Sequence, residues 1–141
     1  MKNTKISAII GIAILGLCIS TNAISDEKQE KAVDAAQTWL ALVDQGSYGE
    51  SWDTAAAYFK QAITKDKWKQ AITAVRKPMG RMLSRKLLSK TYTQSLPGAP
   101  DGEYVVIQFE TSFKNKKSGI ETVTPMLDKD GKWRVSGYYI K

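Results

Sequence analysis

Two carboxylates, a tyrosine and an arginine in the C-terminal half could carry acid–base chemistry: Glu110, Glu121, Arg134 and Tyr138. If the two strand hairpins of this region close symmetrically, Tyr138 lies opposite Glu121, and Ser112 faces Glu121 from the other side. A pocket that withdrew one carboxylate from water would raise its pKa and suit it to proton transfer. The same register places these groups on the face opposite the apolar strand residues. It therefore favours a solvated polar sheet face with cross-strand ion pairs, or a homodimer surface.

A basic run with no acid between Asp66 and Asp101 is the second candidate site. Its cations could receive phosphate, acidic polysaccharide or the headgroups of an anionic membrane surface. A helix C-terminus and an edge strand also favour cations without any ligand. Because strand side chains alternate between faces, the run predicts two weak patches, and without aromatic platforms it does not suit nucleic acid. The run comprises Arg76, Lys77, Arg81, Arg85, Lys86 and Lys90.

The composition excludes several chemistries. The chain of 141 residues has 21 basic and 14 acidic residues, a net charge of +7, no histidine and a single cysteine, Cys18. Zinc sites of Cys and His, nucleophilic triads that use His, and imidazole acid–base catalysis therefore have no residues to build them. We expect neither a metal nor a cofactor. Residues 128–131 (DKDG) resemble the start of a calcium loop, but the following ligands are missing and a hairpin turn is expected.

The N-terminus has the features of a cleavable signal peptide. Lys2 and Lys5 precede an apolar run over residues 6–19, which is shorter than the roughly 20 residues of a membrane-spanning helix. Thr21 and Ala23 suit the −3 and −1 positions of a cleavage site. We expect a signal peptide over residues 1–23, an exported periplasmic protein, and one domain over residues 24–141. The alternatives are an uncleaved anchor or lipidation of Cys18, although Leu17 stands where a lipidation site has a small residue.

Hydrophobic spacing predicts three helices after the leader. Ser25 is a candidate N-cap for the first, whose apolar stripe includes Trp39 and which should end at Gly46. Residues 47–50 (SYGE) form a capping box for a second helix that carries Trp52. Residue Thr64 suits the N-cap of a third helix, which carries Trp68 and should stop at residue 77, before a proline.

Period-two alternation predicts four strands after residue 80. The ranges are about 82–95, 103–113, 120–127 and 132–140, and the first should be long and bulged. The odd-numbered residues of the second strand form a continuous apolar face apart from Thr111. The fold class predicted is α+β, with three N-terminal helices packed on one face of a curved four-stranded antiparallel sheet.

Several stretches of the chain resemble a known family. They include residues 76–80 (RKPMG), 96–104 (LPGAPDGEY), 109–113 (FETSF), 121–124 (ETVT) and 130–135 (DGKWRV). Together they resemble the bacterial domain-of-unknown-function family 4019. The resemblance implies an exported protein with a cone-shaped fold like nuclear transport factor 2 and cystatin. It implies no assigned activity and no catalytic residue.

Two functions follow as expectations. The favoured one is a non-enzymatic module that binds a small ligand or a protein of the envelope. The alternative is a small enzyme like a lyase or isomerase, which would use carboxylate and tyrosine groups. An acid buried beside a tyrosine in the interior would favour the enzyme, whereas a dry apolar interior would favour binding.

Overall fold

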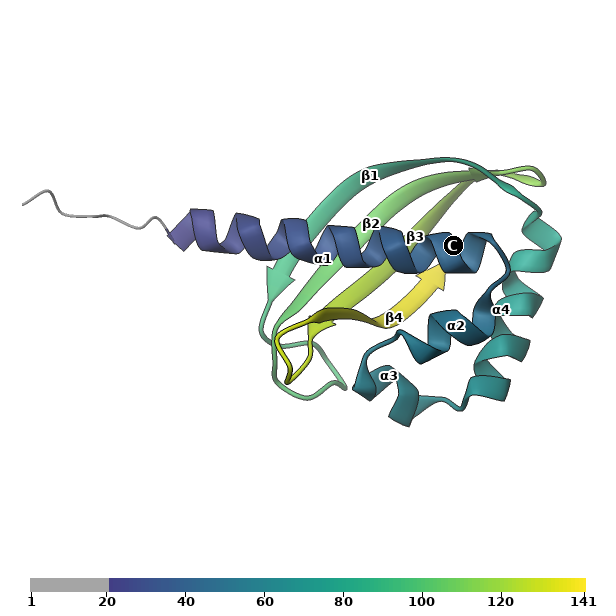
Figure 1. The fold of residues 1–141 in the computed structure, drawn as a ribbon. Coiled ribbons are helices and arrows are strands. Elements are labelled where there is room, and N and C mark those ends of the chain that lie inside the picture. Colours follow the sequence, from purple (N-terminus) through teal and green to yellow (C-terminus); the bar gives the residue numbers. More distant parts are fainter. Residues whose placement is uncertain (1–20) are drawn as a thin grey trace, which may run out of the picture.

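The computed structural model describes residues 21–141, and Figure 1 shows helices followed by a sheet. The predicted signal peptide, including Cys18, lies almost wholly outside the described residues. The elements in chain order are α1 (Thr21–Asp44), α2 (Tyr48–Asp53), α3 (Ala57–Ala62), α4 (Lys65–Met79), β1 (Met82–Thr93), β2 (Tyr104–Phe113), β3 (Lys116–Leu127) and β4 (Trp133–Ile140).

Helix α1 crosses the concave side of the sheet and projects beyond it at its N-terminal end (Figure 1). Its predicted stripe is buried, with Ala36 and Leu40 fully inaccessible to solvent and Trp39 nearly so. The helix begins before Ser25, so this residue is not its N-cap. Gly46 follows it with φ +78°, a conformation that glycine adopts without strain, and this confirms the predicted end.

The predicted second helix is two short helices, so residues 21–141 form four helices where three were expected. The chain leaves the helical path because the backbone N–H of Ala56 donates to the carbonyl of Val135 on β4, at 2.8 Å. Both Ala55 and Ala56 are completely buried at this break. The side chain of Ser47 makes no capping hydrogen bond, so the predicted capping box is wrong.

Helix α4 begins as predicted, because the hydroxyl of Thr64 accepts a hydrogen bond from the backbone N–H of Lys67 at 3.3 Å. It runs through Pro78 and ends at Met79, two residues later than expected, with Gly80 as its C-cap. Gly80 has φ +74°, and a Cβ there would lie 3.2 Å from Cβ of Lys114. This close approach fixes the end of α4 against the β2–β3 turn.

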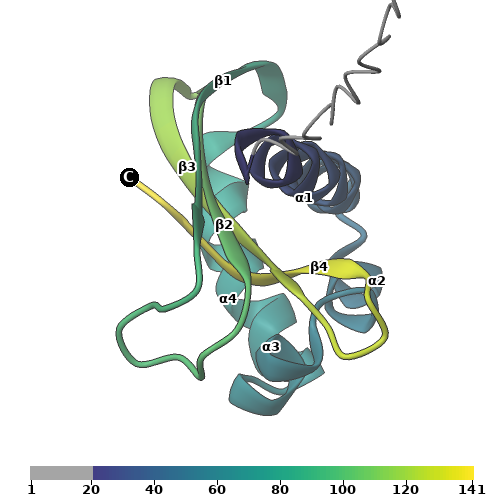
Figure 2. The same ribbon diagram turned by 90° about the vertical axis from the view of Figure 1, so that its left-hand side faces the viewer.

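The sheet has the strand order β1-β2-β3-β4, with every pair antiparallel. It is curved and does not close on itself, and the helices lie on one side of it (Figures 1 and 2). The first strand carries register shifts at Met82/Ser84 and Leu87/Ser89, which confirms the expected bulges. The predicted fold class is therefore confirmed, with the number of helices corrected.

The core lies between α1 and the helix-facing side of the sheet. The odd-numbered residues of β2 are all buried, as the alternation predicted. Around Trp39 the rings of Phe59, Trp68 and Tyr138 pack with centroids 5.5–6.4 Å away. Trp52 is only partly buried, so it contributes less to this core than Trp39 and Trp68.

Candidate functional site

A cluster of charged and polar side chains lies at the inner side of the sheet, near the C-terminal end of α1. We call it the buried ion cluster. It draws one side chain from α1, one from α4 and one from each strand. Its members are Asp44, Arg76, Arg85, Thr111, Glu121 and Tyr138.

Asp44 is held by two arginines. Arg85 donates to both of its carboxylate oxygens, from Nη1 at 2.8 Å and Nη2 at 3.0 Å, and Nη2 of Arg76 donates to Oδ1 at 2.8 Å. Burial alone would raise the pKa of Asp44, but the hydrogen bonds and charges of Arg85 and Arg76 outweigh it. The net effect lowers the pKa of Asp44 below its usual range, so this carboxyl is ionised at neutral pH.

Glu121 has no exposed surface and accepts hydrogen bonds from donors on three other strands. Nε of Arg85 donates to Oε1 at 2.8 Å, the hydroxyl of Thr111 donates to the same oxygen, and the phenol of Tyr138 donates to Oε2 at 2.6 Å. A buried carboxylate is stable only when it is paired and hydrogen-bonded in this way.

Burial also affects two further members of the cluster, Tyr138 and Arg76. Burial, followed by the charge of Glu121 and the hydrogen bond to it, raises the pKa of Tyr138 far above its usual range, so the phenol keeps its proton. Arg76 is 5% exposed and its guanidinium lies 4.8 Å from the ring centre of Phe113. Nε and Nη1 of Arg76 have no hydrogen-bond partner among residues 21–141.

Chemically, the cluster is a closed set of two cations and two carboxylates with a protonated phenol. Arg85 bridges Asp44 and Glu121, which lie in α1 and β3. Both carboxylate oxygens of Glu121 already accept hydrogen bonds from side chains of the same chain. Such an arrangement fixes the helix layer to the sheet, and it leaves neither carboxylate oxygen of Glu121 free of a donor from the chain.

The structure brings Glu121 and Tyr138 together but corrects the face on which they lie. Glu121 is opposite Phe109 rather than Ser112. This displacement of three residues is odd, and an odd shift moves a strand's side chains to the other face of the sheet. Tyr138 is opposite Val123 rather than Glu121, a shift of two that keeps its face. Both residues therefore point toward the helices.

The other two members of the predicted polar face lie elsewhere. Glu110 is exposed and accepts a hydrogen bond from Ser118 at 3.3 Å. Arg134 donates to Asp128 at 2.9 Å and to Asp130 at 2.8 Å within the β3–β4 turn. Hydrogen bonds from Arg134 and from a backbone N–H lower the pKa of Asp130 to about 2.

The predicted basic run is divided by the fold. Arg76 and Arg85 point inward and join the buried ion cluster, so they are not available to an external anion. Lys90 pairs with Glu30 of α1. Lys77, Arg81 and Lys86 are exposed.

Sequence reasoning missed Asp44 and Thr111. Asp44 is an acid in the last turn of a helix, where the helix dipole disfavours negative charge, and this position signals a cationic partner. Thr111 interrupts an otherwise apolar strand face, which signals a buried polar partner. Neither signal identifies the partner itself.

The surface carries several depressions. One of them, which we call the α3 groove, has a volume of about 740 Å³ between α3, residues 100–102 and the β3–β4 turn. It combines Tyr58, Pro100 and Met126 with the carboxylates of Asp101 and Asp128. A second groove of about 470 Å³ lies between α1, α2 and β4 and includes Trp39 and Trp133.

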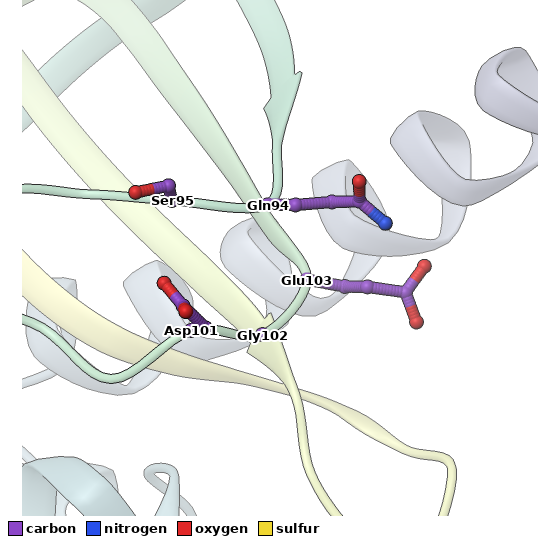
Figure 3. Close-up of a pocket in the computed structure, with 5 residues that line it drawn as sticks. All are labelled: Gln94, Ser95, Asp101, Gly102 and Glu103. Atoms are coloured by element: carbon purple, nitrogen blue, oxygen red, sulfur yellow. The ribbon is translucent and has the colours of Figure 1, made fainter.

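A third depression lies at the end of β1 and is shown in Figure 3. Gln94 and Glu103 point to one side of it, while Ser95 and Asp101 point to the other. Glu103 is already bound by Lys28 and by the phenol of Tyr92. The polar groups of this depression therefore do not converge on a common ligand position.

Comparison with known proteins places the chain in a family. Residues 35–138 match the family model described as "Protein of unknown function (DUF4019)". The chain belongs to this family. No curated protein and no solved structure matches it. The DUF4019 match confirms the family that the sequence stretches resemble, and its span includes every member of the buried ion cluster.

Two properties of this DUF4019 chain bear on its site. In residues 21–141, the helices are all too short or too polar to cross a membrane. Over the same residues, no three acidic, histidine or cysteine side chains gather in a way that could hold a metal ion.

Proposed function

We propose that this DUF4019 protein is an exported, non-enzymatic module that binds a small ligand or a protein of the envelope. One observation carries the proposal: Glu121, the residue best placed for acid–base chemistry, is sealed from solvent and saturated by three donors of its own chain. The cluster around it serves as a rigid frame for the surface.

The positions of Glu121 and Tyr138, away from the surface depressions, support this proposal. Catalysis requires a position within hydrogen-bond distance of both the base and the reacting atom. Among residues 21–141, neither Glu121 nor Tyr138 lines any of the depressions described above. The raised pKa of Tyr138 also makes its phenol a poor acid at neutral pH.

The α3 groove is the best candidate for the binding surface. Its volume of about 740 Å³ lies within the range of small-molecule sites, which are roughly 300–1,000 Å³. The groove combines an aromatic ring and apolar side chains with carboxylates and with the cations Lys60, Lys129 and Arg134, so it could hold a small molecule that carries polar groups of either charge. The hydroxyl of Tyr58 donates to the carbonyl of Gly98 at 3.2 Å, which fixes the ring at the groove wall.

A second candidate function is a small enzyme like a lyase or isomerase. It is favoured by the pairing of Glu121 with Tyr138 on the helix-facing side of the sheet, where a buried acid beside a tyrosine was the expected mark of an enzyme. This function would require the cluster to open, because Glu121 has no exposed surface.

Export is part of the proposal, in the form of a periplasmic protein that begins at Ile24. N-terminal sequencing of protein recovered from the envelope fraction would test it. An intact leader in a soluble cytoplasmic pool would contradict export. A lipid-modified N-terminus at Cys18, or a retained leader in the membrane fraction, would replace the periplasmic form with an anchored one.

The binding proposal can be tested by native mass spectrometry of the protein recovered from the envelope, followed by titration of the molecule identified. Tyr58→Ala should weaken its binding about tenfold or more by removing a wall of the groove. The matched control is Tyr139→Ala, which alters an exposed tyrosine outside the groove. Conversion of the bound molecule that stops in Glu121→Gln, with the fold intact, would establish the enzyme instead.

A further inference from the structure

One corner of the molecule carries a surface of cations, which we call the basic corner. It consists of Lys77 near the end of α4, Arg81 before β1, and Lys114, Lys116 and Lys117 at the β2–β3 turn. All are exposed except Lys116, which is partly buried. Within residues 21–141, none of them forms an ion pair with an acidic side chain.

The fold holds these cations together although they come from two separate stretches of the chain. The backbone N–H of Lys114 donates to the carbonyl of Arg81 at 2.8 Å, and that of Asn115 donates to Met79 at 2.9 Å. The amide of Asn115 also donates to the carbonyl of Pro78 at 3.2 Å. Figure 1 shows the β2–β3 turn beside the end of α4, at the opposite end of the molecule from the start of α1.

Among residues 21–141, the nearby acids form no ion pair with the basic corner. Asp44 is enclosed by Arg76 and Arg85, so its charge is compensated in the interior. Glu110 lies opposite Lys86 in the sheet and is bonded to Ser118. The corner therefore presents five cations without an acidic partner among residues 21–141, and salt screens their field over roughly 8 Å at physiological ionic strength.

An apolar side chain accompanies the cations. Leu83 is 53% exposed and lies two residues from Arg81 in the chain. We propose that the basic corner docks on an anionic phospholipid bilayer, with the cations at the headgroups and Leu83 at the boundary of the acyl chains. A bilayer binds cations at its headgroups and apolar side chains at its acyl chains, whereas a soluble polyanion offers no apolar surface to an exposed leucine. This surface is separate from the α3 groove.

Co-sedimentation with lipid vesicles tests the proposal. The protein is purified with the N-terminus that it has in the cell. It is then mixed with pure phosphatidylcholine vesicles and with vesicles that contain about one third phosphatidylglycerol. We expect binding to the anionic vesicles in excess of the neutral ones, and this excess should fall between about 50 and about 150 mM NaCl. Each cation at an anionic surface contributes roughly fivefold to partitioning, so the variant Arg81→Gln/Lys114→Gln/Lys117→Gln should lose on the order of 100-fold.

The matched control removes the same charge elsewhere. Lys67, Lys69 and Lys129 are exposed and lie at the start of α4 and in the β3–β4 turn. Lys67→Gln/Lys69→Gln/Lys129→Gln should bind within a few-fold of the parent protein. Equal losses in the two triple variants would overturn the proposal, because total charge would then explain the binding.

A separate variant tests the contribution of Leu83. Leu83→Ser should weaken binding to anionic vesicles several-fold without changing its dependence on salt. Binding to dextran sulfate that matches vesicle binding, with no effect of Leu83→Ser on either, would assign the corner to soluble polyanions and overturn the bilayer. The absence of any preference for anionic over neutral vesicles would likewise overturn it.

Discussion

The phenol of Tyr138 donates a hydrogen bond to Glu121 at 2.6 Å, from a position diagonal to it in the sheet. The residue directly opposite Glu121 is Ile140, and the one opposite Tyr138 is Val123. The bond therefore closes the buried ion cluster from β4, an edge strand of the sheet and the last strand in the chain.

Replacing Tyr138 with phenylalanine should destabilise the domain by about 1–3 kcal/mol, because one oxygen of a buried carboxylate loses its donor. Chemical denaturation followed by tryptophan fluorescence measures the change. The neighbouring residue provides the control, since Tyr139 is 53% exposed and Tyr139→Phe should change the free energy of unfolding by less than about 0.5 kcal/mol. Similar effects in both variants would mean that the bond to Glu121 contributes nothing specific.

Arg85→Met should cost about 3–5 kcal/mol, because it leaves both Asp44 and Glu121 without their shared cation in the interior. The comparison is Lys65→Met, which removes the exposed ion pair with Asp53 and should cost about 1 kcal/mol or less. Denaturant midpoints for the two variants give the difference. A loss at Arg85 as small as that at Lys65 would show that the cluster is solvated.

Acid should weaken the domain partly through Asp44. Its pKa in the folded state lies below the unfolded value of about 3.9, so its contribution to stability is present above that value. The contribution is lost as the pH falls through the lower, folded-state pKa. Asp44→Asn should therefore be less stable than the parent protein at pH 7, and the gap should close on acidification. Urea titrations across this range test the sign, and a gap that stays constant would exclude Asp44 as its source.

The tryptophans should differ in their contribution to stability. The indole of Trp68 is buried and donates to the hydroxyl of Ser51 at 3.0 Å, so Trp68→Ala should cost about 3–5 kcal/mol. Trp52 is only partly buried, although its indole donates to the carbonyl of Ile63 at 2.8 Å, and Trp52→Ala should cost less. Thermal denaturation of the two variants gives the order, and the reverse order would contradict the core described above.

Much of the fold follows from local patterns in the sequence. The alternation in residues 103–113 predicts β2 and its buried face, and Gly46 and Thr64 mark helix boundaries through backbone chemistry within a few residues. Each of these signals depends on neighbours in the chain. The break between α2 and α3 was missed because it depends on a hydrogen bond from Ala56 to the distant strand β4.

The candidate site was only partly predictable, for a related reason. Glu121 and Tyr138 were paired correctly, but the assumed β2–β3 register placed them on the wrong face. Strand β3 begins at Lys116, four residues before the predicted start, so the turn is tighter than the symmetric closure assumed. The arginines appeared free of acids because Asp44 and Glu121 are 32 and 36 positions away from Arg76 and Arg85 along the chain.

The buried ion cluster has a consequence for how the domain comes apart. Each of its six side chains sits on a different element, so loss of α1, α4 or any strand leaves charged or polar groups of the remaining elements unpaired in an apolar interior. Partly assembled forms are thereby raised in free energy relative to both the complete fold and the open chain. The elements should consequently melt together, in one cooperative transition without a populated intermediate.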